Sequence, residues 1–291
     1  MEEFFIDKST CNNCGVCAKV CPALCLEISP DKKVNFRTDT LHLCLGCGQC
    51  MAVCKTGSVI SKGMSYSDDF FEIADDNSFF SLPEKRRSVR RFKPRAVSRE
   101  EIDKILYAVS QAPHGDSHHH VEITVVNSRE KLMEALPLMS KFYDDLVGWL
   151  KNPVISTVIR LKQGKDGMNT LRNHLLPRIL KGVYKNYNYD YDGITRGAHT
   201  LLIFHADKHS EEHKEDSYIF VTYAMLAAQA LGLGSTVIGL VPPAVNKLPQ
   251  LKKLFNIPES NEAVTSIIIG YPKYKYYRGI KRELKGVHWI N

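Results

Sequence analysis

The feature that most constrains this chain is a cysteine pattern that occurs twice near its amino end. CNNCGVCAKVC begins at Cys11 and CLGCGQCMAVC begins at Cys44, and both have the spacing C-x2-C-x2-C-x3-C. All nine cysteines of the 291 residues lie between Cys11 and Cys54. The first residues show neither the basic nor the apolar stretch of an export signal. Because disulfides persist in oxidising compartments, ligand duty explains these cysteines better than a disulfide framework.

The two runs predict a pair of [4Fe-4S] clusters. Such a cube needs four thiolates; a tight loop supplies three of them, and the fourth comes from elsewhere in the chain. In a two-cluster module the fourth cysteine of each run binds the other cluster. The expected ligands of the first cluster are Cys11, Cys14, Cys17 and Cys54, and those of the second cluster are Cys44, Cys47, Cys50 and Cys21.

Zinc is the alternative metal for these cysteines. Zinc knuckles use C-x2-C pairs rather than triplets followed by a fourth cysteine, so the spacing favours clusters. The ninth cysteine, Cys25, is expected to be a small buried apolar residue. Residues 1–63 resemble the bacterial two-cluster ferredoxins, in which a proline follows the fourth cysteine of a run. Pro22 keeps that pattern, whereas Lys55 stands at the second position.

A basic segment, KRRSVRRFKPR, spans Lys85 to Arg95 and holds seven basic residues in eleven. Its Arg-x-Ser-x-Arg pattern sets guanidinium, hydroxyl and guanidinium groups at alternate positions, which suits a phosphate dianion. A solvated face, a nucleic-acid patch and a sorting signal are the alternatives. The net charge of +7 is weak support for nucleic acid, because each cluster with its thiolates carries about −2.

The same segment is similar to the R-x-S-[VI]-R-x-F motif of the nitroreductase family of flavoproteins. Three further matches follow in the family's order, and the resemblance covers roughly residues 82–280: QAPHGDSHHH (111–120), LGLGSTVIGL (231–240) and IIIGYPKYKYYR (267–278). The resemblance implies FMN, with its phosphate and ribityl chain near Arg86, Arg87, Ser88 and Arg90. It also implies contacts with the flavin or its phosphate from Pro113, His114, Ile238, Gly239 and Arg278. Backbone N–H groups around Ile238 and Gly239 would approach the flavin edge.

The expected fold class is α+β, in two domains. A small ferredoxin-like domain (1–63) and a linker (64–81) precede a nitroreductase-like domain (82–291) with a mixed β-sheet flanked by helices. Ser98 and Glu101 predict a capping box for a helix that stops before Pro113. Strands are expected at 121–127, 199–206 and 263–271, with a short one after residue 234. A central helix with a glycine C-cap is expected at 218–234, and helical pieces of an insertion or lid at 131–196.

The histidine triplet at 118–120 leaves the catalytic residue open. A metal site is one interpretation, although only two of three adjacent side chains share a face of a strand. Proton donation to a substrate is the other, because the pKa of histidine lies near neutrality, and His119 is the candidate. The chain has no G-x-G-x-x-G motif, so a Rossmann nicotinamide site is not expected.

Together these features predict an oxidoreductase: an iron–sulfur flavoprotein reductase whose clusters reduce FMN, which then reduces a nitroaromatic, a quinone or an activated alkene. Ferredoxin or a similar low-potential protein is the expected electron donor. The alternatives are a relay whose FMN reduces another protein, and an iron–sulfur protein that binds nucleic acid through residues 85–95. The family implies a homodimer. A cytoplasmic protein without a membrane span is expected, because the longest apolar run, 219–231, is short.

Overall fold

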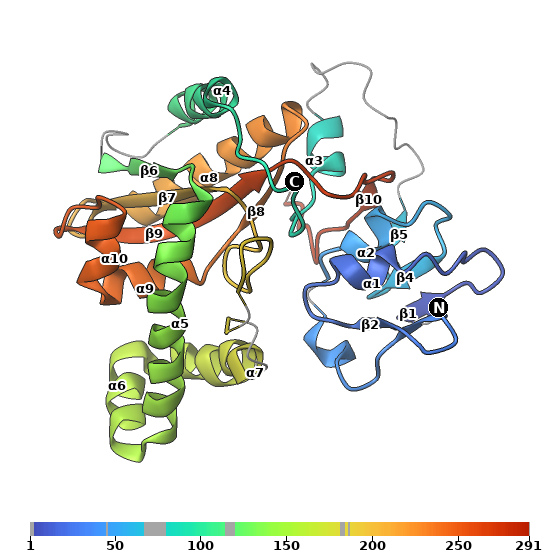
Figure 1. Cartoon of the computed structure of the whole chain (residues 1–291), viewed down its shortest axis with the longest axis horizontal. Coiled ribbons are helices and arrows are strands. Elements are labelled where there is room, and N and C mark those ends of the chain that lie inside the picture. Colours follow the sequence, from blue (N-terminus) through green and yellow to red (C-terminus); the bar gives the residue numbers. More distant parts are fainter. Residues whose placement is uncertain are drawn as a thin grey trace. The chain divides into compact units, whose positions relative to one another are not determined.

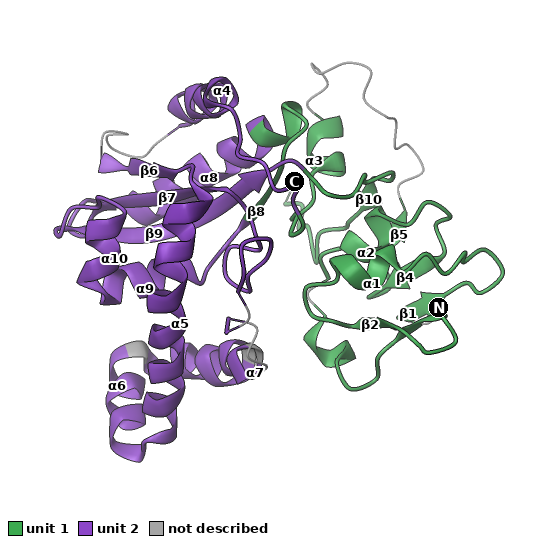
Figure 2. Ribbon diagram, in the orientation of Figure 1, with its two compact units in different colours: residues 1–91, 228–236, 272–291 green, residues 92–227, 237–271 purple. Residues whose placement is uncertain are grey.

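The computed structural model describes residues 3–44, 46–66, 80–113, 120–180, 184–185 and 187–290 (Figure 1). The chain divides into two compact units (Figure 2). Unit 1 consists of residues 1–91, 228–236 and 272–291, and unit 2 of residues 92–227 and 237–271. The sequence predicted consecutive domains with boundaries at residues 63 and 81. Unit 1 instead combines three segments that are distant in the sequence. Most of the predicted linker lies outside the described residues.

Unit 1 contains the two cysteine runs, and its architecture repeats with them. β1 (Phe4–Ile6) pairs antiparallel with β4 (Val59–Ser61), and β2 (Leu26–Ile28) pairs antiparallel with β3 (Val34–Phe36). The short helices α1 (Val16–Val20) and α2 (Gln49–Ala52) each carry the third cysteine of a run. Both begin after a left-handed glycine, with φ of 70° at Gly15 and 68° at Gly48. Glycine adopts this conformation without strain, so both runs turn into their helix in the same way.

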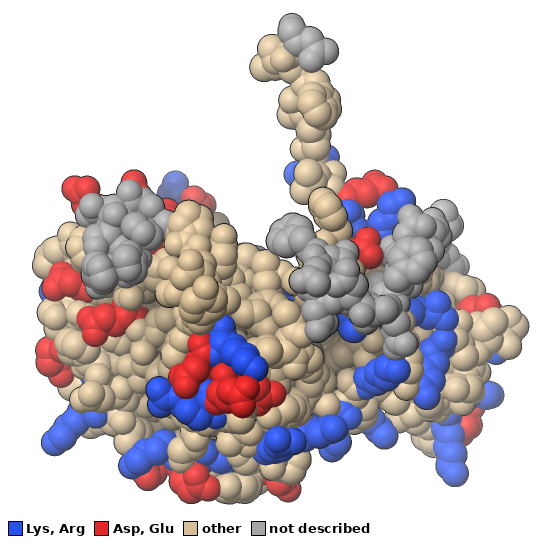
Figure 3. Space-filling view, turned by 90° about the horizontal axis from the view of Figure 1, so that it is seen from above, with Lys and Arg blue, Asp and Glu red and all other residues tan. Residues whose placement is uncertain are grey.

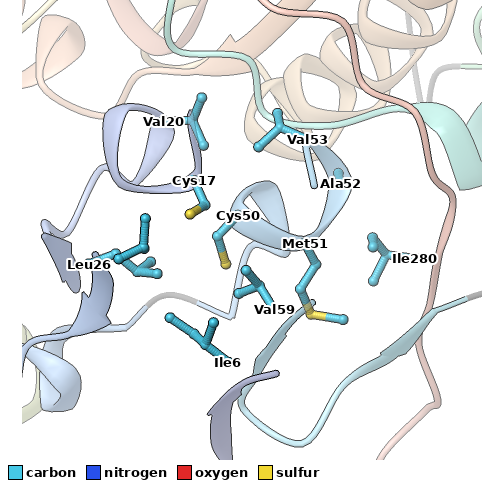
Figure 4. Packing of buried hydrophobic residues seen from close by; sticks show 11 residues of the cluster. Ile6, Cys17, Val20, Leu26, Cys50, Met51, Ala52, Val53, Val59 and Ile280 are labelled. Atoms are coloured by element: carbon cyan, nitrogen blue, oxygen red, sulfur yellow. The ribbon is translucent and has the colours of Figure 1, made fainter. Parts of the chain in front are cut away.

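The rest of unit 1 comes from both ends of the chain. The 3-10 turn η1 (Leu41–Leu43) precedes Cys44, and α3 (Ser81–Lys85) precedes the basic segment. β5 (Ser65–Tyr66) pairs antiparallel with β10 (Ile280–Lys281), which lies more than two hundred residues later in the chain. Figure 4 shows Ile280 in the same buried cluster as Met51, with Cys17 and Cys50 side by side. The C-terminal segment therefore completes the core around the cysteine runs.

A four-stranded sheet with the order β6-β7-β9-β8 supports the remainder of the chain. The middle strands β7 (Thr200–Asp207) and β9 (Asn261–Gly270) are antiparallel, with Leu202 opposite Ile267. β6 (Glu122–Val126) pairs antiparallel with β7, and β8 is the short strand Gly234–Val237. The apolar runs in β7 and in the second half of β9 are buried and are typical of strands covered on both faces. The strands predicted at 121–127, 199–206 and 263–271 are thus confirmed within one or two residues.

Helices flank this sheet. α9 (Val241–Lys247) packs on β9, and α5 (Arg129–Lys151) packs on α9 and on α10 (Pro249–Leu254). α6 (Pro153–Thr170) packs on α5, and the π-helical turn η3 (Leu171–Leu175) leads into α7 (Leu176–Leu180). The helical pieces predicted at 131–196 are confirmed, and their role as a lid stays a prediction. Among the described residues, no helix is long and apolar enough to cross a membrane.

Two predicted helix ends are confirmed in detail. α4 (Arg99–Ser110) has the capping box: Ser98 accepts from the backbone N–H of Glu101, whose side chain accepts from that of Ser98. α8 (His213–Ala230) begins earlier than predicted but ends as expected at Gly232, which has φ of 73°. The Gly232 N–H donates to the carbonyl of Gln229, and the next N–H donates to that of Ala228. This pair of bonds is the Schellman motif, and glycine supplies its left-handed residue.

Candidate functional site

The structure gathers the cysteines of unit 1 into two groups. None of the nine forms a disulfide bond. Burial, foremost, raises the pKa of Cys17 to about 12, and electrostatic interactions with three other cysteines add to the shift: Cys54, Cys14 and Cys11. These neighbours are the other three expected ligands of the first cluster. A thiolate here needs a compensating positive charge, which the irons of a cluster supply.

The second group lines a cavity. Its walls include the four expected ligands of the second cluster: Cys21, Cys44, Cys47 and Cys50. Burial raises the pKa of Cys50 well above its usual range, and Cys47 and Cys21 add to the effect. Cys25 lies at the same cavity, but its thiol donates toward the carbonyl of Thr40 at 3.3 Å. Cys25 is therefore buried as the sequence predicted, in contact with a ligand site.

Backbone N–H groups support the two cysteines that end the runs. The N–H of Cys25 donates to Sγ of Cys21 at 3.2 Å, and the N–H of Ser58 donates to Sγ of Cys54 at 3.3 Å. Burial alone would raise the pKa of Cys54, but hydrogen bonds from Thr56 and from backbone N–H groups outweigh it and lower the pKa. N–H donors favour the thiolate form, so the repeat prepares both sulfurs for metal.

The donor set fits cubane clusters. Within the described part of the chain, no three Cys, His, Asp or Glu side chains come close enough to share a single metal ion. Four thiolates around a cube stand farther apart than that, because each binds a different iron. Thiolates are also the ligands that iron–sulfur clusters require.

The basic segment is fixed against the glycine-rich LGLG segment within unit 1. Ser88 forms a parallel bridge with Ser235, and the N–H of Val89 donates to the Ser235 carbonyl at 3.0 Å. A Cβ at Gly234 would lie 2.6 Å from Cγ2 of Val89, closer than real Cβ contacts. Gly234 therefore permits the two segments to approach. Ser88 and Ser235 are 147 positions apart in the chain, so two distant sequence matches meet as one local structure.

Arginines crowd beside this junction. Burial, foremost, lowers the pKa of Arg87 to about 10, and the nearby Arg282 and Arg86 lower it further, while Cys47 opposes the shift. Arg87 donates to the carbonyls of Arg86 and Glu84, and its Nε is buried without a hydrogen-bond partner among the described residues. The pKa of Arg86 is lowered by burial and by Arg282 as well. Like charges gathered this closely fit an anionic group.

Arg278 has other partners in the structure. Its Nε donates to the carbonyl of Cys54 at 3.0 Å, and its Nη2 donates to that of Lys55 at 2.7 Å. Its guanidinium also lies over the ring of Tyr66, 5.2 Å from the ring centroid. The sequence predicted an FMN phosphate contact here and did not predict these contacts with a cysteine run. Arg90 donates to the carbonyl of Ser88 at 3.1 Å, within the motif itself.

The remaining expected flavin contacts belong to unit 2. The N–H of Ile238 already donates to the Ser266 carbonyl at 2.8 Å, so it is not available to the flavin. Of the two backbone N–H groups expected at the flavin edge, that of Gly239 remains. A Cβ at Gly239 would meet nothing within 4 Å, so space is open beside it. Pro113 is exposed just after α4. His114 and His119 lie outside the described residues.

The motifs and their packing define an oxidoreductase domain joined to an iron–sulfur domain. The sequence matches the Nitroreductase family over residues 84–271 and a 4Fe-4S dicluster domain over residues 5–58. The chain therefore belongs to the nitroreductase family and carries a ferredoxin-type module at its amino end. The resemblances found in the sequence are confirmed, as is the α+β class.

Similar proteins cover the nitroreductase part. Iodotyrosine deiodinase of Thermotoga neapolitana is 25% identical over 207 residues, which are 68% of this chain and 92% of that protein. The nitroreductase of Bacteroides fragilis with bound FMN has a TM-score of 0.54 at 20% identity, over 74% of this chain and 99% of its own. An FMN-dependent nitroreductase of Clostridium difficile has a TM-score of 0.51 at 21% identity, over 74% and 100%. At these identities the solved structures establish the fold.

Proposed function

We propose that this chain is an iron–sulfur flavoprotein reductase, which passes electrons from two [4Fe-4S] clusters through FMN to an organic acceptor. The position of the arginine motif carries the proposal. Arg87 interacts electrostatically with Cys47, and Arg91 donates to the carbonyl of Lys19 at 3.3 Å, all within unit 1. The segment expected to hold a phosphate thus lies against the segments expected to hold the clusters.

Two sets of four cysteines would hold the clusters. The cysteines that raise the pKa of Cys17 electrostatically are the other three members of the first set, which supports that set. The four cysteines of the second set line one cavity, which supports the second set. Cys21 and Cys54 each connect one run to the other run's cluster, so neither cluster forms from one run alone. The first set is Cys11, Cys14, Cys17 and Cys54, and the second is Cys44, Cys47, Cys50 and Cys21.

FMN, when bound, supplies chemistry that accepts single electrons and delivers one or two. The crowded guanidiniums of the basic segment would hold its phosphate, with Nε of Arg87 as a donor in need of an acceptor. The N–H of Gly239 would stabilise negative charge on the ring. Nε and Nη2 of Arg278 already donate to the carbonyls of Cys54 and Lys55. A phosphate contact from Arg278 would therefore have to use its other N–H groups. The expected phosphate contacts are Arg86, Arg87, Ser88 and Arg90; Pro113 and His114 would line the ring.

The donor, the acceptor and the assembly complete the proposal. A cluster module on the same chain as the flavin raises the effective concentration of the electron source, which suits a low-potential donor such as ferredoxin. The acceptor would be a nitroaromatic, a quinone or an activated alkene. A cytoplasmic homodimer is part of the proposal. Large apolar side chains on α6 and in the C-terminal tail support it, because Leu161 is 80% exposed and Trp289 is 84% exposed.

The content of the anaerobically purified protein tests the proposal. Two clusters predict about eight irons and eight sulfides per chain, together with one FMN. Protein that contains flavin but no iron would contradict the proposed supply of electrons by clusters. Protein that contains iron but no flavin would contradict the proposed reductase. Reduction of a nitroaromatic by protein that had been reduced with dithionite would support a small acceptor, whereas no turnover with any of the three acceptor classes would contradict it.

A further inference from the structure

The C-terminal segment, residues 272–282, binds the second cysteine run along its length. The N–H of Tyr277 donates to the Ala52 carbonyl at 3.0 Å, and Arg282 donates to the Cys47 carbonyl at 2.8 Å. Ile280 fills the core beside Gly48. The loop around the second cluster is thus held by residues that come after the whole flavin domain.

Gln49 is the residue of this run whose environment is incomplete. Its side chain is buried, with 1% of its surface exposed, and it lines the cavity formed by the second cluster's four cysteines. Its amide Nε2 is buried and has no hydrogen-bond partner among the described residues. Buried amide donors are nearly always paired in folded proteins, so Nε2 needs an acceptor that the described residues do not supply.

Tyr276 determines which way the amide points. Its hydroxyl donates to Oε1 of Gln49 at 2.9 Å. Burial, foremost, raises the pKa of Tyr276 above its usual range, so the hydroxyl keeps its proton and remains a donor. With Oε1 engaged by this hydroxyl, the N–H groups of the amide are the ones left for the cavity.

We propose that Gln49 donates an amide N–H to a sulfur of the second cluster and thereby raises that cluster's reduction potential above that of the first. Tyr276 is a positioning residue, because it acts through Gln49. Hydrogen bonds to cluster sulfurs stabilise the reduced, more negative state and so raise the potential. The inference rests on the proposed ligation of the second cluster.

The repeat supplies a comparison within the same chain. Gly15-Val16-Cys17 of the first run corresponds to Gly48-Gln49-Cys50 of the second. Val16 has no side-chain donor, so the first cluster lacks this bond. Positive charge acts in the same direction at the second cluster, because Arg282 donates to the Cys47 carbonyl and Arg87 interacts with Cys47. The amide is a further difference between the clusters, and a substitution at Gln49 isolates it from the charges.

This order gives electron transfer a direction. One electron leaves the first cluster and enters the second. The first cluster is thereby oxidised by one electron and the second is reduced by one electron, and no bond forms or breaks. The second cluster is also the one whose ligand Cys47 interacts with Arg87 of the expected phosphate segment. Electrons would therefore enter at the first cluster and collect at the second, on the side of the FMN phosphate motif.

Gln49→Leu tests the inference, because leucine has a similar shape and no donor. The holoprotein is titrated with reductant, and the two reduced clusters are followed by electron paramagnetic resonance. Only the difference between the strength of the bond in the reduced and in the oxidised cluster shifts the potential, and we expect this difference to be worth about tenfold in the electron's distribution, which is about 59 mV for one electron. We expect the higher potential to fall by roughly this amount and the lower one to stay. Tyr276→Phe should lower the higher potential by a smaller amount, and Val16→Leu should change neither of the two potentials.

Two results would overturn the inference. One is Gln49→Leu protein with full iron content and both potentials unchanged; the other is a shift of equal size in both clusters. If Gln49→Leu loses iron, Gln49→Met keeps the side-chain length and decides the question in the same titration. Wild-type protein with fewer than two clusters contradicts the proposed function instead, so the two failures are distinguishable.

Discussion

Replacing Arg87 with methionine should weaken cofactor binding and leave folding stability nearly unchanged. Arg87 is 4% exposed, and its pKa is lowered to about 10 by burial and by Arg282 and Arg86. Against an ordinary arginine pKa of about 12.5, this corresponds to about 3 kcal/mol of unfavourable free energy for the charged form. Methionine keeps the length of the side chain and removes the charge. The cost of the buried charge then disappears, together with two hydrogen bonds from a charged donor to carbonyls, worth about 1.5 kcal/mol or more each, so the gain and the loss roughly cancel.

FMN binding should weaken in the same variant. A guanidinium–phosphate hydrogen bond contributes about 1.5–3 kcal/mol, so the FMN dissociation constant should rise by roughly ten- to hundredfold. Quenching of FMN fluorescence measures the affinity, and thermal unfolding of FMN-free protein with intact clusters measures the stability. We expect the FMN-free variant to unfold close to the wild-type temperature. Sulfate should stabilise the FMN-free wild type more than the variant.

The matched control for this experiment is Arg99→Met. The Arg99 side chain is 85% exposed and pairs with Asp103 on the surface of α4, so its loss should change stability by well under about 1 kcal/mol and leave FMN affinity unchanged. The reasoning is refuted if Arg87→Met binds FMN as the wild type does. It is also refuted if the FMN-free variant loses about 2 kcal/mol or more, because Arg87 would then act through packing.

Three further substitutions test other parts of the structure. Gly234→Ala should cost about 1–3 kcal/mol of unfolding free energy, because its Cβ would meet Val89 at 2.6 Å. Asp192→Ala should cost about 3–5 kcal/mol, because it leaves the fully buried Arg129 guanidinium without its carboxylate. Burial, foremost, lowers the pKa of His205 in the folded protein. The free energy of unfolding should therefore be at its full value above pH of about 6.5 and should decrease at lower pH, because the unfolded chain binds a proton there that folded His205 does not bind. His205→Gln should reduce this decrease.

Each of these predictions has a discriminating comparison. Gly239→Ala adds the same methyl group where nothing lies within 4 Å, so equal destabilisation by the two alanines would contradict the packing argument. Arg129→Met combined with Asp192→Ala should cost less than the sum of the single changes, and strict additivity would contradict the coupling. An acid-induced loss of stability that persists undiminished in His205→Gln would assign it to other groups. Thermal and chemical unfolding measure all three.

The sequence was informative where function depends on local spacing. Cysteine spacing predicted the 4Fe-4S domain that the family match confirms, because a cube imposes a short and regular pattern on the loop that holds it. The same holds for the capping box at Ser98 and the glycine end of α8. These features use hydrogen bonds between residues within five positions of one another, so the sequence contains all the information they need.

Contacts between distant segments were not predictable in this way. Gln49 and Tyr276 are 227 positions apart, and no periodicity connects them. Arg278 was predicted from its family position as a phosphate contact, but its carbonyl partners at Cys54 and Lys55 follow from the return of the C-terminal segment to unit 1. One signal was present in the repeat itself, since Gln49 stands where the first run has Val16.

The face of the molecule in Figure 3 shows Lys and Arg side chains interspersed with Asp and Glu, in keeping with the net charge of +7. The positive charge that we propose for phosphate binding lies around the buried Arg87, which solvent screens far less than surface charge. Phosphate affinity in this proposal therefore depends on Arg87 and its neighbouring guanidiniums rather than on the net charge.

The most direct test of electron flow from clusters to flavin is a single-turnover experiment with Cys47→Ser protein that still contains FMN. Reduced ferredoxin is mixed rapidly with wild type and variant under anaerobic conditions, and the loss of the oxidised-flavin absorption is followed. If the second cluster feeds the flavin, the bleaching should be fast in the wild type and slower by at least about tenfold in the variant. Equal bleaching rates in the two proteins would show that electrons reach FMN without the cluster and would contradict the proposal.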